Sequence, residues 1–476
     1  MPRPPRPGAR PLVLAIDLGT SSVRSALFDE SAQLIPGSRA SQIYEVRHSV
    51  EHGAELDPAI LLRATQRCLR HTRGRLKTGS VPAIAGSGFW HSLLGLDRAG
   101  EPLTPAYTWG DTRGADDAAR LRGQLDERII QQRTGCMLRA PFWPAKLAWL
   151  RRTRPGLFRR VARWVSPAEW VFEKIFGARG CSHSMASGTG LYHLGRRDWD
   201  EELLRLSGLT SAQLGPLQDR LEGNGRTIFP AIGDGAAGNL GSAATRERFV
   251  AINAGTSAAV RAVPSAHATL PFGLFQFVID QNRHLLGGAV SNAGNLRAWC
   301  LRELRLPNDE RNLERLLRQA GPDAARLTIL PFWVAERAPT WPETLAGAVI
   351  GLSQATTAAD LLRATLTAVC LRLADILEQL ESAIGRAKRI IVSGGILHSP
   401  AWLQILADSL GRDLELCADQ EASLRGAAVH ALEQLGHEIP APESGKRVRH
   451  QPAATRQARE LRARQRSLEA LFASWR

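Results

Sequence analysis

The feature that most constrains the fold of this chain is an internal repeat. The segment Ala15–Ser21 recurs as Ala251–Ser257, and both copies have an apolar run followed by Gly-Thr-Ser. Each copy predicts a strand, a turn and a second strand, which together form a β-hairpin that opens a domain. The offset of 236 residues is too long for a solenoid and indicates duplication of a whole domain. We therefore expect two similar domains with a ligand cleft between them; chance similarity of two short segments is the alternative.

Apolar patterning outside the repeat alternates between helix and strand periods, which predicts an α/β protein. Expected strands are Leu12–Ile16 (interrupted by Asp17), Ser22–Phe28, Ile84–Gly88, Leu93–Asp97, Ala258–Val263 and Arg389–Ser393. Expected helices are Pro58–His71, Arg113–Gln132, Pro144–Arg152, Pro167–Phe176, Asn292–Glu303, Asp309–Gln319, Thr356–Ile384 and Pro400–Leu410.

The net charge of +15 raises the question of a nucleic-acid partner. Much of the charge lies at the ends: the first ten residues carry three Arg and no acid, and residues 441–476 carry nine Lys and Arg against three acids. Basic tails are usually solvated, so we predict no nucleic-acid partner, and binding through the tails is the minority alternative. Apolar residues within the C-terminal tail could dock on the body or on a partner subunit, so a homodimer remains open.

The remaining composition is that of a soluble globular protein of two or more domains, with 44% hydrophobic and 22% charged residues. The six cysteines include no Cys-x-x-Cys pair and have no nearby His cluster, so neither a zinc site nor a disulfide framework is predicted. No segment approaches the ~18 apolar residues of a membrane span. We expect a cytoplasmic protein without membrane contact.

The first copy of the repeat places the carboxylate of Asp17 just before Gly19, Thr20 and Ser21. Backbone N–H groups of such a turn can surround a phosphate oxygen, and the carboxylate can hold Mg²⁺ directly or through water. The second copy offers another phosphate loop, made of Gly255, Thr256 and Ser257, but its acidic position is Asn253. One acidic loop suits one metal ion. An ordinary hairpin turn is the alternative for either loop alone.

A third motif, Gly233–Asn239, places Asp234 between glycines at the predicted entrance to a short helix. Helix-start N–H groups favour an ionised carboxylate, and flanking glycines let a substrate approach the backbone. Such a carboxylate can accept the proton of a hydroxyl that attacks a γ-phosphate, so Asp234 is the predicted general base. A simple helix cap is the alternative.

Aromatic, acidic and basic residues cluster after two predicted strands, in the His segment (Ser87–Ser92) and the Trp segment (Tyr107–Arg113). A sugar needs an apolar ring against its C–H face and bidentate hydrogen bonds to its hydroxyls. The candidates are Trp90, His91, Trp109, Asp111 and Arg113. The alternatives are a core role for each Trp, a satisfied interior His91 and a structural ion pair between Asp111 and Arg113.

Two glycines, Gly394 and Gly395, follow the strand Arg389–Ser393. Without Cβ atoms, this turn lets an adenine and its ribose lie against the backbone. Alone, this turn is weak evidence for a nucleotide site.

In order and spacing, these motifs resemble the FGGY family of carbohydrate kinases over about residues 11–437. The resemblance implies two ribonuclease-H-like domains of the actin and hexokinase superfold, with a central cleft that closes on ATP, Mg²⁺ and a small-molecule sugar. It also implies transfer of the γ-phosphate to a terminal hydroxyl. The expected parts are a basic tail (1–10), an N-terminal domain (11–247), a C-terminal domain (248–437) and a second basic tail (438–476).

Residue by residue, the resemblance assigns Asp17 to the metal, Gly19, Thr20 and Ser21 to the first phosphate loop, and Asp234 to catalysis. It assigns Gly255 and Thr256 to the second phosphate loop, Gly394 and Gly395 to the adenosine, and the aromatic cluster to the sugar. The residues of the His, Trp and Asp234 motifs resemble most those of the gluconate kinase branch, although xylulose, ribulose and glycerol kinases share the same set of motifs.

Two departures from the family pattern stand out. The segment Cys181–Gly190 lacks an acid that the family usually has near Ser182, which puts local packing or a sugar contact in question. Gly110 stands where gluconate-like members often have Ala, a minor change.

Other classes of function compete with an active kinase. A sugar sensor that keeps the fold without chemistry would not require both Asp17 and Asp234. An ATPase chaperone or actin-like polymer former would explain the phosphate loops but would not need the His and Trp segments.

Overall fold

The structure is a computed structural model that describes residues 12–76, 81, 83–223, 225–265, 268–319, 326–419, 421–442 and 445–474. It divides into two compact units. Unit 1 comprises Met1–Ala243, Phe275–Leu285 and Glu421–Pro442, and unit 2 comprises Ala244–Leu274, Leu286–Gln420 and Glu443–Arg476. The expected domain boundary near residue 247 lies close to the first change of unit. Two later segments that the sequence places in the C-terminal domain belong to unit 1. The expected N-terminal tail, residues 1–10, lies outside the described residues.

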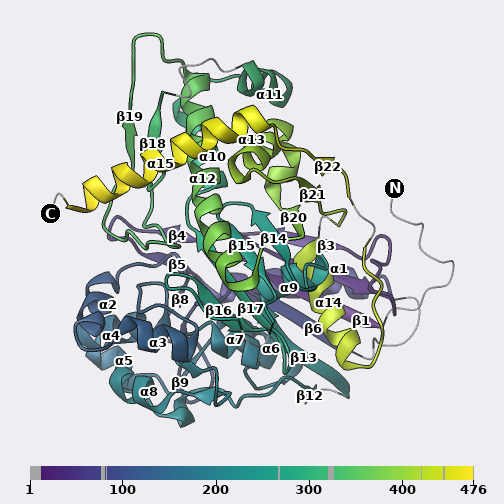
Figure 1. The fold of residues 1–476 in the computed structure, drawn as a ribbon. Coiled ribbons are helices and arrows are strands. Elements are labelled where there is room, and N and C mark those ends of the chain that lie inside the picture. The colour runs from purple at the N-terminus through teal and green to yellow at the C-terminus, as the bar shows by residue number, and fades with distance from the viewer. Residues whose placement is uncertain are drawn as a thin grey trace. The chain divides into compact units, whose positions relative to one another are not determined.

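Unit 1 is built on a six-stranded sheet in the order β12-β13-β6-β1-β2-β3 (Figure 1). At its centre, β1 (Val13–Leu18) pairs antiparallel with β2 (Ser22–Phe28) and parallel with β6 (Ala83–Gly88). Every residue of β1 and β6 is buried. β13 (Arg226–Gly233) runs parallel to β6, and β12 (Leu221–Gly223) and β3 (Ala40–Ile43) are the antiparallel edges. The carboxyl ends of β1, β6 and β13 therefore meet at one edge of this sheet.

Two pairs of helices pack on this sheet. One pair is α1 (Pro58–Arg73) and α6 (Pro167–Phe176), and the other is α9 (Asp234–Gly241) and α14 (Ala422–Gln434). α6 begins with a Ser166–Glu169 capping box and ends at Gly177 in the left-handed conformation, as expected for a short helix.

Unit 1 contains further strands and helices besides these. They are β4 (Arg47–His48), β5 (Ala54–Leu56), β7 (Leu94–Leu96), β8 (Ala106–Tyr107), α2 (Ala115–Arg122), α3 (Glu127–Thr134), α4 (Trp143–Thr153), α5 (Pro155–Arg160), β9 (Arg163–Val165), α7 (His183–Ser187), β10 (Tyr192–His193), β11 (Asp198–Trp199), α8 (Glu201–Ser207), the 3₁₀ turn Ser211–Gln213 and β16 (Phe275–Val278).

Unit 2 repeats the central pattern of unit 1. β14 (Phe249–Ala254) pairs antiparallel with β15 (Ala258–Ala262) and parallel with β20 (Arg389–Ser393). The other elements are β17 (His284–Val290, divided between the units at Leu285), α10 (Gly294–Glu303), α11 (Glu310–Gln319), β18 (Thr328–Leu330), β19 (Ala348–Ile350), α12 (Ala358–Ile384), the 3₁₀ turn Gly395–His398, α13 (Pro400–Leu410), β21 (Leu414–Leu416), β22 (Arg447–Val448) and α15 (Pro452–Ser474). α12 runs through the apolar core of this unit and contacts α10, α11 and α13.

The C-terminal segment differs from the solvated tail expected from its charge. Its helix α15 packs on α12, α13 and β18. Glu469 of this helix forms a buried ion pair with Arg372 of α12 at 2.6 Å, and the Gln465 amide donates to the Ile329 carbonyl at 2.8 Å. The net charge of the segment did not predict this docking, because the residues that make the contacts lie on only one face of the helix. Trp475 and Arg476 lie outside the described residues.

Both hairpins of the repeat are confirmed, and the strand Arg389–Ser393 and the helices Pro167–Phe176 and Pro400–Leu410 form as expected. The interruption at Asp17 is wrong: β1 continues to Leu18, because Asp17 pairs with Arg24 and Ser87 of the flanking strands. The single helix over 113–132 is also wrong. It divides into α2 and α3, since Gly123 ends the first and the Asp126 side chain caps the second.

Candidate active site

Three predicted site segments begin at one edge of the sheet of unit 1. Leu18 and Gly233 both lie opposite Gly88 in the parallel register of β1, β6 and β13. The first phosphate loop, the His segment and Asp234 therefore start side by side, at the carboxyl ends of parallel strands where α/β proteins usually bind ligands.

The first phosphate loop is held on both flanks. The Gly19 N–H donates to the Ser22 carbonyl at 2.9 Å, and the Tyr44 hydroxyl donates to the Gly19 carbonyl. From the Trp segment, the indole Nε1 of Trp109 donates to the Thr20 hydroxyl at 3.0 Å. Ser21 is exposed. Two subsites predicted separately are thus joined by one hydrogen bond.

Asp17 is buried beneath this loop, with 1% of its surface exposed. Its Oδ1 accepts from the Ser87 hydroxyl, and its Oδ2 lies 3.0 Å from the Arg24 guanidinium. Burial raises the pKa of the Asp17 carboxyl, and Arg24 and Ser87 oppose that rise. Arg24 also pairs with Glu421 at 3.0 Å. The carboxylate is therefore held in place by a network that runs from β2 to the residue just before α14.

The residues around Asp17 fit a divalent ion that takes most of its ligands from elsewhere. Asp17 Oδ2 accepts no aligned hydrogen bond within the described part of the chain. Over the same residues, no three His, Cys, Asp or Glu side chains gather into a metal cluster. Mg²⁺ often binds through one or two carboxylates and completes its shell with water and phosphate oxygens, which matches this single acid.

Asp234 is the first residue of α9, directly after β13. Its Oδ1 accepts the Gly235 N–H at 2.7 Å, and the side chain is half-buried. The positive end of the helix dipole favours the ionised carboxylate. The expected position at a helix entrance is confirmed.

The core alternative holds for Trp90, which is 5% exposed. Its Nε1 donates to the Ser184 carbonyl at 2.9 Å, and its ring centroid lies 4.7 Å from that of Phe277. A Cβ atom on Gly233 would lie 1.8 Å from the Trp90 ring, and one on Gly188 would lie 2.3 Å away. Trp90 therefore supports the strand end that precedes Asp234.

His91 has a positive φ of 67°, which is uncommon for a residue with a side chain. Its Nδ1 is hydrogen-bonded to the Gly188 carbonyl, and its ring contacts those of Phe142 and Phe277. A carbonyl oxygen only accepts, so Nδ1 carries a proton, and in a neutral ring Nε2 would be the acceptor.

Asp111 and Arg113 form the ion pair that the sequence left as an alternative. Arg113 Nε lies 3.1 Å from Asp111 Oδ1, and Arg113 also binds Glu55 at 2.7 Å. The guanidinium lies 4.4 Å from the centre of the Trp149 ring. Asp111 in turn accepts the Ala54 N–H at 3.2 Å. Two carboxylates thus engage Arg113, and the pair shapes the Trp segment.

Lys146 of α4 holds the His segment in place, and the sequence analysis missed it. It is 1% exposed, and its Nζ donates to the carbonyls of His91 at 2.9 Å and Pro141 at 2.6 Å. Burial lowers the pKa of its ammonium group to about 7, while Asp111 favours the charged form. The signal in the sequence is a lone Lys within the apolar run Trp143–Leu150.

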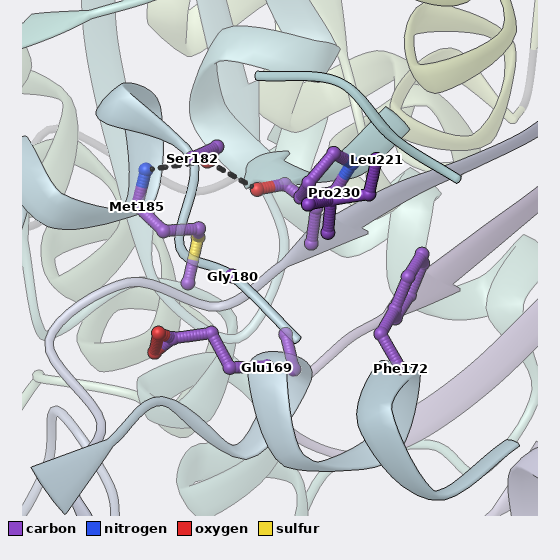
Figure 2. Close-up of a pocket in the computed structure, with 9 residues that line it drawn as sticks. Glu169, Phe172, Gly180, Ser182, Met185, Leu221 and Pro230 are labelled. Atoms are coloured by element: carbon purple, nitrogen blue, oxygen red, sulfur yellow. Dashed lines mark hydrogen bonds between the residues drawn. The ribbon is translucent and has the colours of Figure 1, made fainter. Parts of the chain in front are cut away.

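Ser182 caps the short helix α7 in the segment where the expected acid is missing. The Ser182 hydroxyl accepts from the Met185 N–H at 3.0 Å and donates to the Ala231 carbonyl of β13 at 2.6 Å. Figure 2 shows Ser182 beside Met185 with these hydrogen bonds dashed. Ser is as good an N-cap as Asp, so α7 keeps its start. The small cavity beside it has an apolar wall, with Glu169 as its acid. Burial raises the pKa of Glu169 to about 7.

The predicted site residues of unit 2 lie at the ends of β14 and β20. The Gly255 N–H donates to the Ser257 carbonyl at 2.9 Å, and the Thr256 carbonyl accepts from Asn295 at 3.1 Å. Gly394 has φ 92°, and a Cβ atom there would lie 2.6 Å from the Ala254 carbonyl oxygen. Only glycine suits that position. The second phosphate loop and the glycine pair are therefore adjacent within this unit.

Comparison with known proteins decides the family. The model of the N-terminal domain of the FGGY family of carbohydrate kinases matches residues 12–233, and the model of its C-terminal domain matches residues 250–434. The chain belongs to the FGGY family of carbohydrate kinases. It is therefore a phosphotransferase with an alcohol acceptor, from a family that uses ATP.

Relatives of this FGGY kinase differ in the acceptor that their names give. A gluconokinase of Bacillus subtilis (strain 168) is 26% identical over 455 residues, which cover 89% of this chain and 88% of that protein. A ligand-bound xylulose kinase structure from Lactobacillus acidophilus has a TM-score of 0.88 at 22% identity, covering 97% and 98% of the two chains. Plasmodium falciparum glycerol kinase with ADP has a TM-score of 0.79 at 18% identity, covering 96% and 98%. These structures establish the two-domain actin and hexokinase-like fold.

In this FGGY kinase, no helix of the described residues combines the length and apolarity needed to cross a bilayer.

Arg24 is a further residue that the sequence analysis missed. The hairpin register places it directly opposite Asp17, so strict pairing of Ser22–Phe28 against β1 could have found it.

Proposed function

We propose that this FGGY kinase transfers the γ-phosphoryl group of ATP to a hydroxyl of a sugar acid or polyol, with gluconate as the first candidate and 6-phosphogluconate as its product. The main support is the strand register, in which Leu18 and Gly233 both lie opposite Gly88. The phosphate loop, the His segment and Asp234 follow these three residues and therefore lie side by side. Similarity to the Bacillus subtilis gluconokinase supports gluconate, and the xylulose and glycerol kinases among the related proteins supply the alternative acceptors.

In the proposed reaction, Asp234 accepts the proton of the attacking hydroxyl as the oxygen approaches the γ-phosphorus. Its place at the start of α9 supports the ionised form that this role needs. His91 would accept a hydrogen bond from an acceptor hydroxyl through Nε2. The half-buried Trp109 ring would cover the C–H face of the sugar. The buried Asp111 would order this segment through Arg113, and the partly exposed Arg113 would be the member of the pair that meets the hydroxyls.

For the nucleotide, the proposed ligands come from two kinds of loop. The phosphate loops are Gly19, Thr20 and Ser21 together with Gly255, Thr256 and Ser257, and the adenosine site is Gly394 and Gly395. Mg²⁺ held near Asp17 would neutralise charge on the phosphate oxygens. A cytoplasmic location is supported by the six cysteines, which are all buried and show no spacing of a disulfide framework.

The test measures ADP release with ATP and Mg²⁺ against gluconate, xylulose, ribulose, glycerol and erythritol. One acceptor should give turnover, and Asp234→Asn should lower kcat for it by about 10²–10⁴-fold with little change in ATP affinity. Asp57→Asn is the matched control, because Asp57 caps α1 on the surface and Asn caps equally well.

Turnover that survives in Asp234→Asn would overturn the role of this residue. A wild-type protein that binds ATP and phosphorylates no acceptor of the panel would favour a non-catalytic sugar sensor instead.

A further inference from the structure

We propose that Trp109 is a positioning residue for phosphate binding, whose indole N–H orients the Thr20 hydroxyl so that its proton points to the nucleotide phosphates. The proposal rests on the proposed function above and concerns only residues of unit 1. It gives the Trp segment a second role besides contact with the sugar.

The direction of the hydrogen bond is fixed by chemistry. The distance from Trp109 Nε1 to Thr20 Oγ1 is 3.0 Å. An indole N–H can only donate, whereas a hydroxyl both donates and accepts. The Thr20 oxygen must therefore accept from Trp109, and its own proton is left to be donated to another group. Phosphate oxygens only accept, so this is the orientation that a phosphate ligand requires.

The backbone of the loop already has its own restraints. The Tyr44 hydroxyl donates to the Gly19 carbonyl, and the Gly19 N–H is bonded to the Ser22 carbonyl. Rotation of the Thr20 hydroxyl is a freedom that these backbone bonds do not remove. The bond from Trp109 restrains that rotation before a ligand arrives, and this reduces the entropy that binding would otherwise lose.

Trp109 itself is held by its neighbours in sequence. The Thr108 N–H and hydroxyl both donate to the Ala54 carbonyl, at 2.9 Å and 3.0 Å, and Asp111 accepts the Ala54 N–H at 3.2 Å. The residues on both sides of the indole are therefore anchored to one residue of β5. An acceptor that packs against this ring would act on the same N–H that orients Thr20. Any effect of acceptor binding on phosphate binding through this N–H must be matched by an equal effect in the other direction.

The test is a set of binding titrations with the full chain, using β,γ-imido-ATP with Mg²⁺ and, as a probe without phosphates, adenosine. Trp109→Phe keeps an aromatic ring and removes the N–H. It should weaken binding of the ATP analogue about tenfold, as expected for one hydrogen bond that serves a charged ligand, and leave adenosine binding unchanged. In a Thr20→Val background, Trp109→Phe should add no further loss, because it acts through Thr20.

Trp164→Phe is the matched control. Trp164 is buried in unit 1, and its Nε1 has no hydrogen-bond partner among the described residues, so the same ring change removes no bond and should leave binding of the analogue unchanged. Equal loss for adenosine and the analogue, or additive losses in the double variant, would overturn the proposal.

The binding arms decide the role of Trp109 even if no acceptor is phosphorylated, so failure of the proposed function would be seen separately in the ADP-release assay. A wild-type protein that does not bind the analogue would overturn both proposals.

Discussion

The two copies of the repeated hairpin have the same strand pairing but differ in the side chains that the strands carry. In both, the first strand pairs in parallel with a strand from later in the chain, β6 for β1 and β20 for β14. The residue opposite the acidic position is a serine in each case, since Asp17 faces Ser87 and Asn253 faces Ser393. The duplication is therefore visible in the pairing of the strands as well as in the sequence.

The polar groups at this position have opposite hydrogen-bonding roles. Asp17 accepts from the Ser87 hydroxyl, whereas the Asn253 amide donates to the Ser393 oxygen at 3.0 Å. Across the hairpin, Asp17 faces Arg24 and Asn253 faces Ala259. The neutral copy forms the same hairpin without the ion pair. The fold thus does not need the charge of the first copy, which points to a functional reason for it.

The strands that flank the hairpins also diverge where they end. β6 leads into the His segment, with two large aromatic side chains and a histidine, while β20 leads into Gly394 and Gly395. The first strand end is followed by bulky side chains, of which Phe89 and Trp90 are buried, and the second by two residues without side chains. The two units therefore differ in the groups that follow matching strands, as the proposed acceptor and adenosine sites require.

The largest effect on kcat is expected when the acidic residue of the first copy is replaced by the amide found in the second. Asp17→Asn removes the carboxylate assigned to the metal while keeping size and a partner for Ser87. We expect kcat to fall about a hundredfold or more, because charge stabilisation in phosphoryl transfer depends on the metal. Steady-state kinetics over a range of Mg²⁺ concentrations should show a weaker response to the ion in the variant.

The reverse change, Asn253→Asp, is the control for this comparison. It should leave kcat within a few-fold of the wild type, since the second copy has no proposed metal. A variant Asp17→Asn that retains more than a tenth of the wild-type kcat would show that the charge difference between the copies is not functional.

A glycine exchange at matched positions tests the second difference, with a smaller expected effect. Gly88 and Gly394 follow the two serines directly. Gly394→Ala places a Cβ at a positive φ and 2.6 Å from the Ala254 carbonyl oxygen, which should cost about 1–3 kcal/mol of stability and raise KM for ATP. In Gly88→Ala, the new Cβ would lie 3.0 Å from the Cβ of Ala168.

Because φ at Gly88 is not in the left-handed region, the change there should cost about 1 kcal/mol and spare KM for ATP. Thermal unfolding and steady-state kinetics of the two variants check this order. If the two variants lost the same stability and raised KM for ATP equally, the glycine pair would have no specific role in nucleotide binding.

The sequence predicted the parts of the fold that local patterns determine. Asp234 and the two Gly-Thr-Ser turns stand in short motifs whose neighbours fix their backbone, so the hairpins and the start of α9 form as expected. The helix break at residues 123–126 was missed because apolar periodicity continues through it, although Gly123 and Asp126 are ordinary signals for a helix end and a helix start.

Side-chain partnerships were less accessible. The inward packing of Trp90 depends on Gly188 and Gly233, which are distant in the sequence and leave space for a ring only when the three meet. The bond from Trp109 to Thr20 joins positions 89 residues apart. The docking of α15 depends on Arg372, a buried charge that no apolar pattern reveals. Each of these depends on tertiary proximity, which a single sequence does not encode locally.

The smallest predicted effect concerns a difference in how the two strand ends are supported. The His91 carbonyl is held by Lys146, whereas the Gly394 carbonyl accepts from the backbone N–H of Leu397 at 3.1 Å. Lys146→Met should therefore raise KM for the acceptor several-fold, since the His91 carbonyl loses a buried donor, and leave KM for ATP unchanged. Lys174→Met is the control, because Lys174 pairs with Glu101 on the surface. A parallel rise in both KM values would indicate a general loss of structure.

The stability of the wild type relative to Lys146→Met should also depend on pH in a defined direction. Burial lowers the pKa of Lys146 from 10.5 to about 7 in the folded protein. Between these values the unfolded chain holds the proton and the folded chain has released it, so the unfolded state binds more protons. Wild-type stability should then rise with pH relative to the variant across this window. The difference in Tm measured at about pH 6 and about pH 9 reports it. A constant difference would mean that Lys146 keeps its proton in the folded protein, because the attraction of Asp111 outweighs the effect of burial.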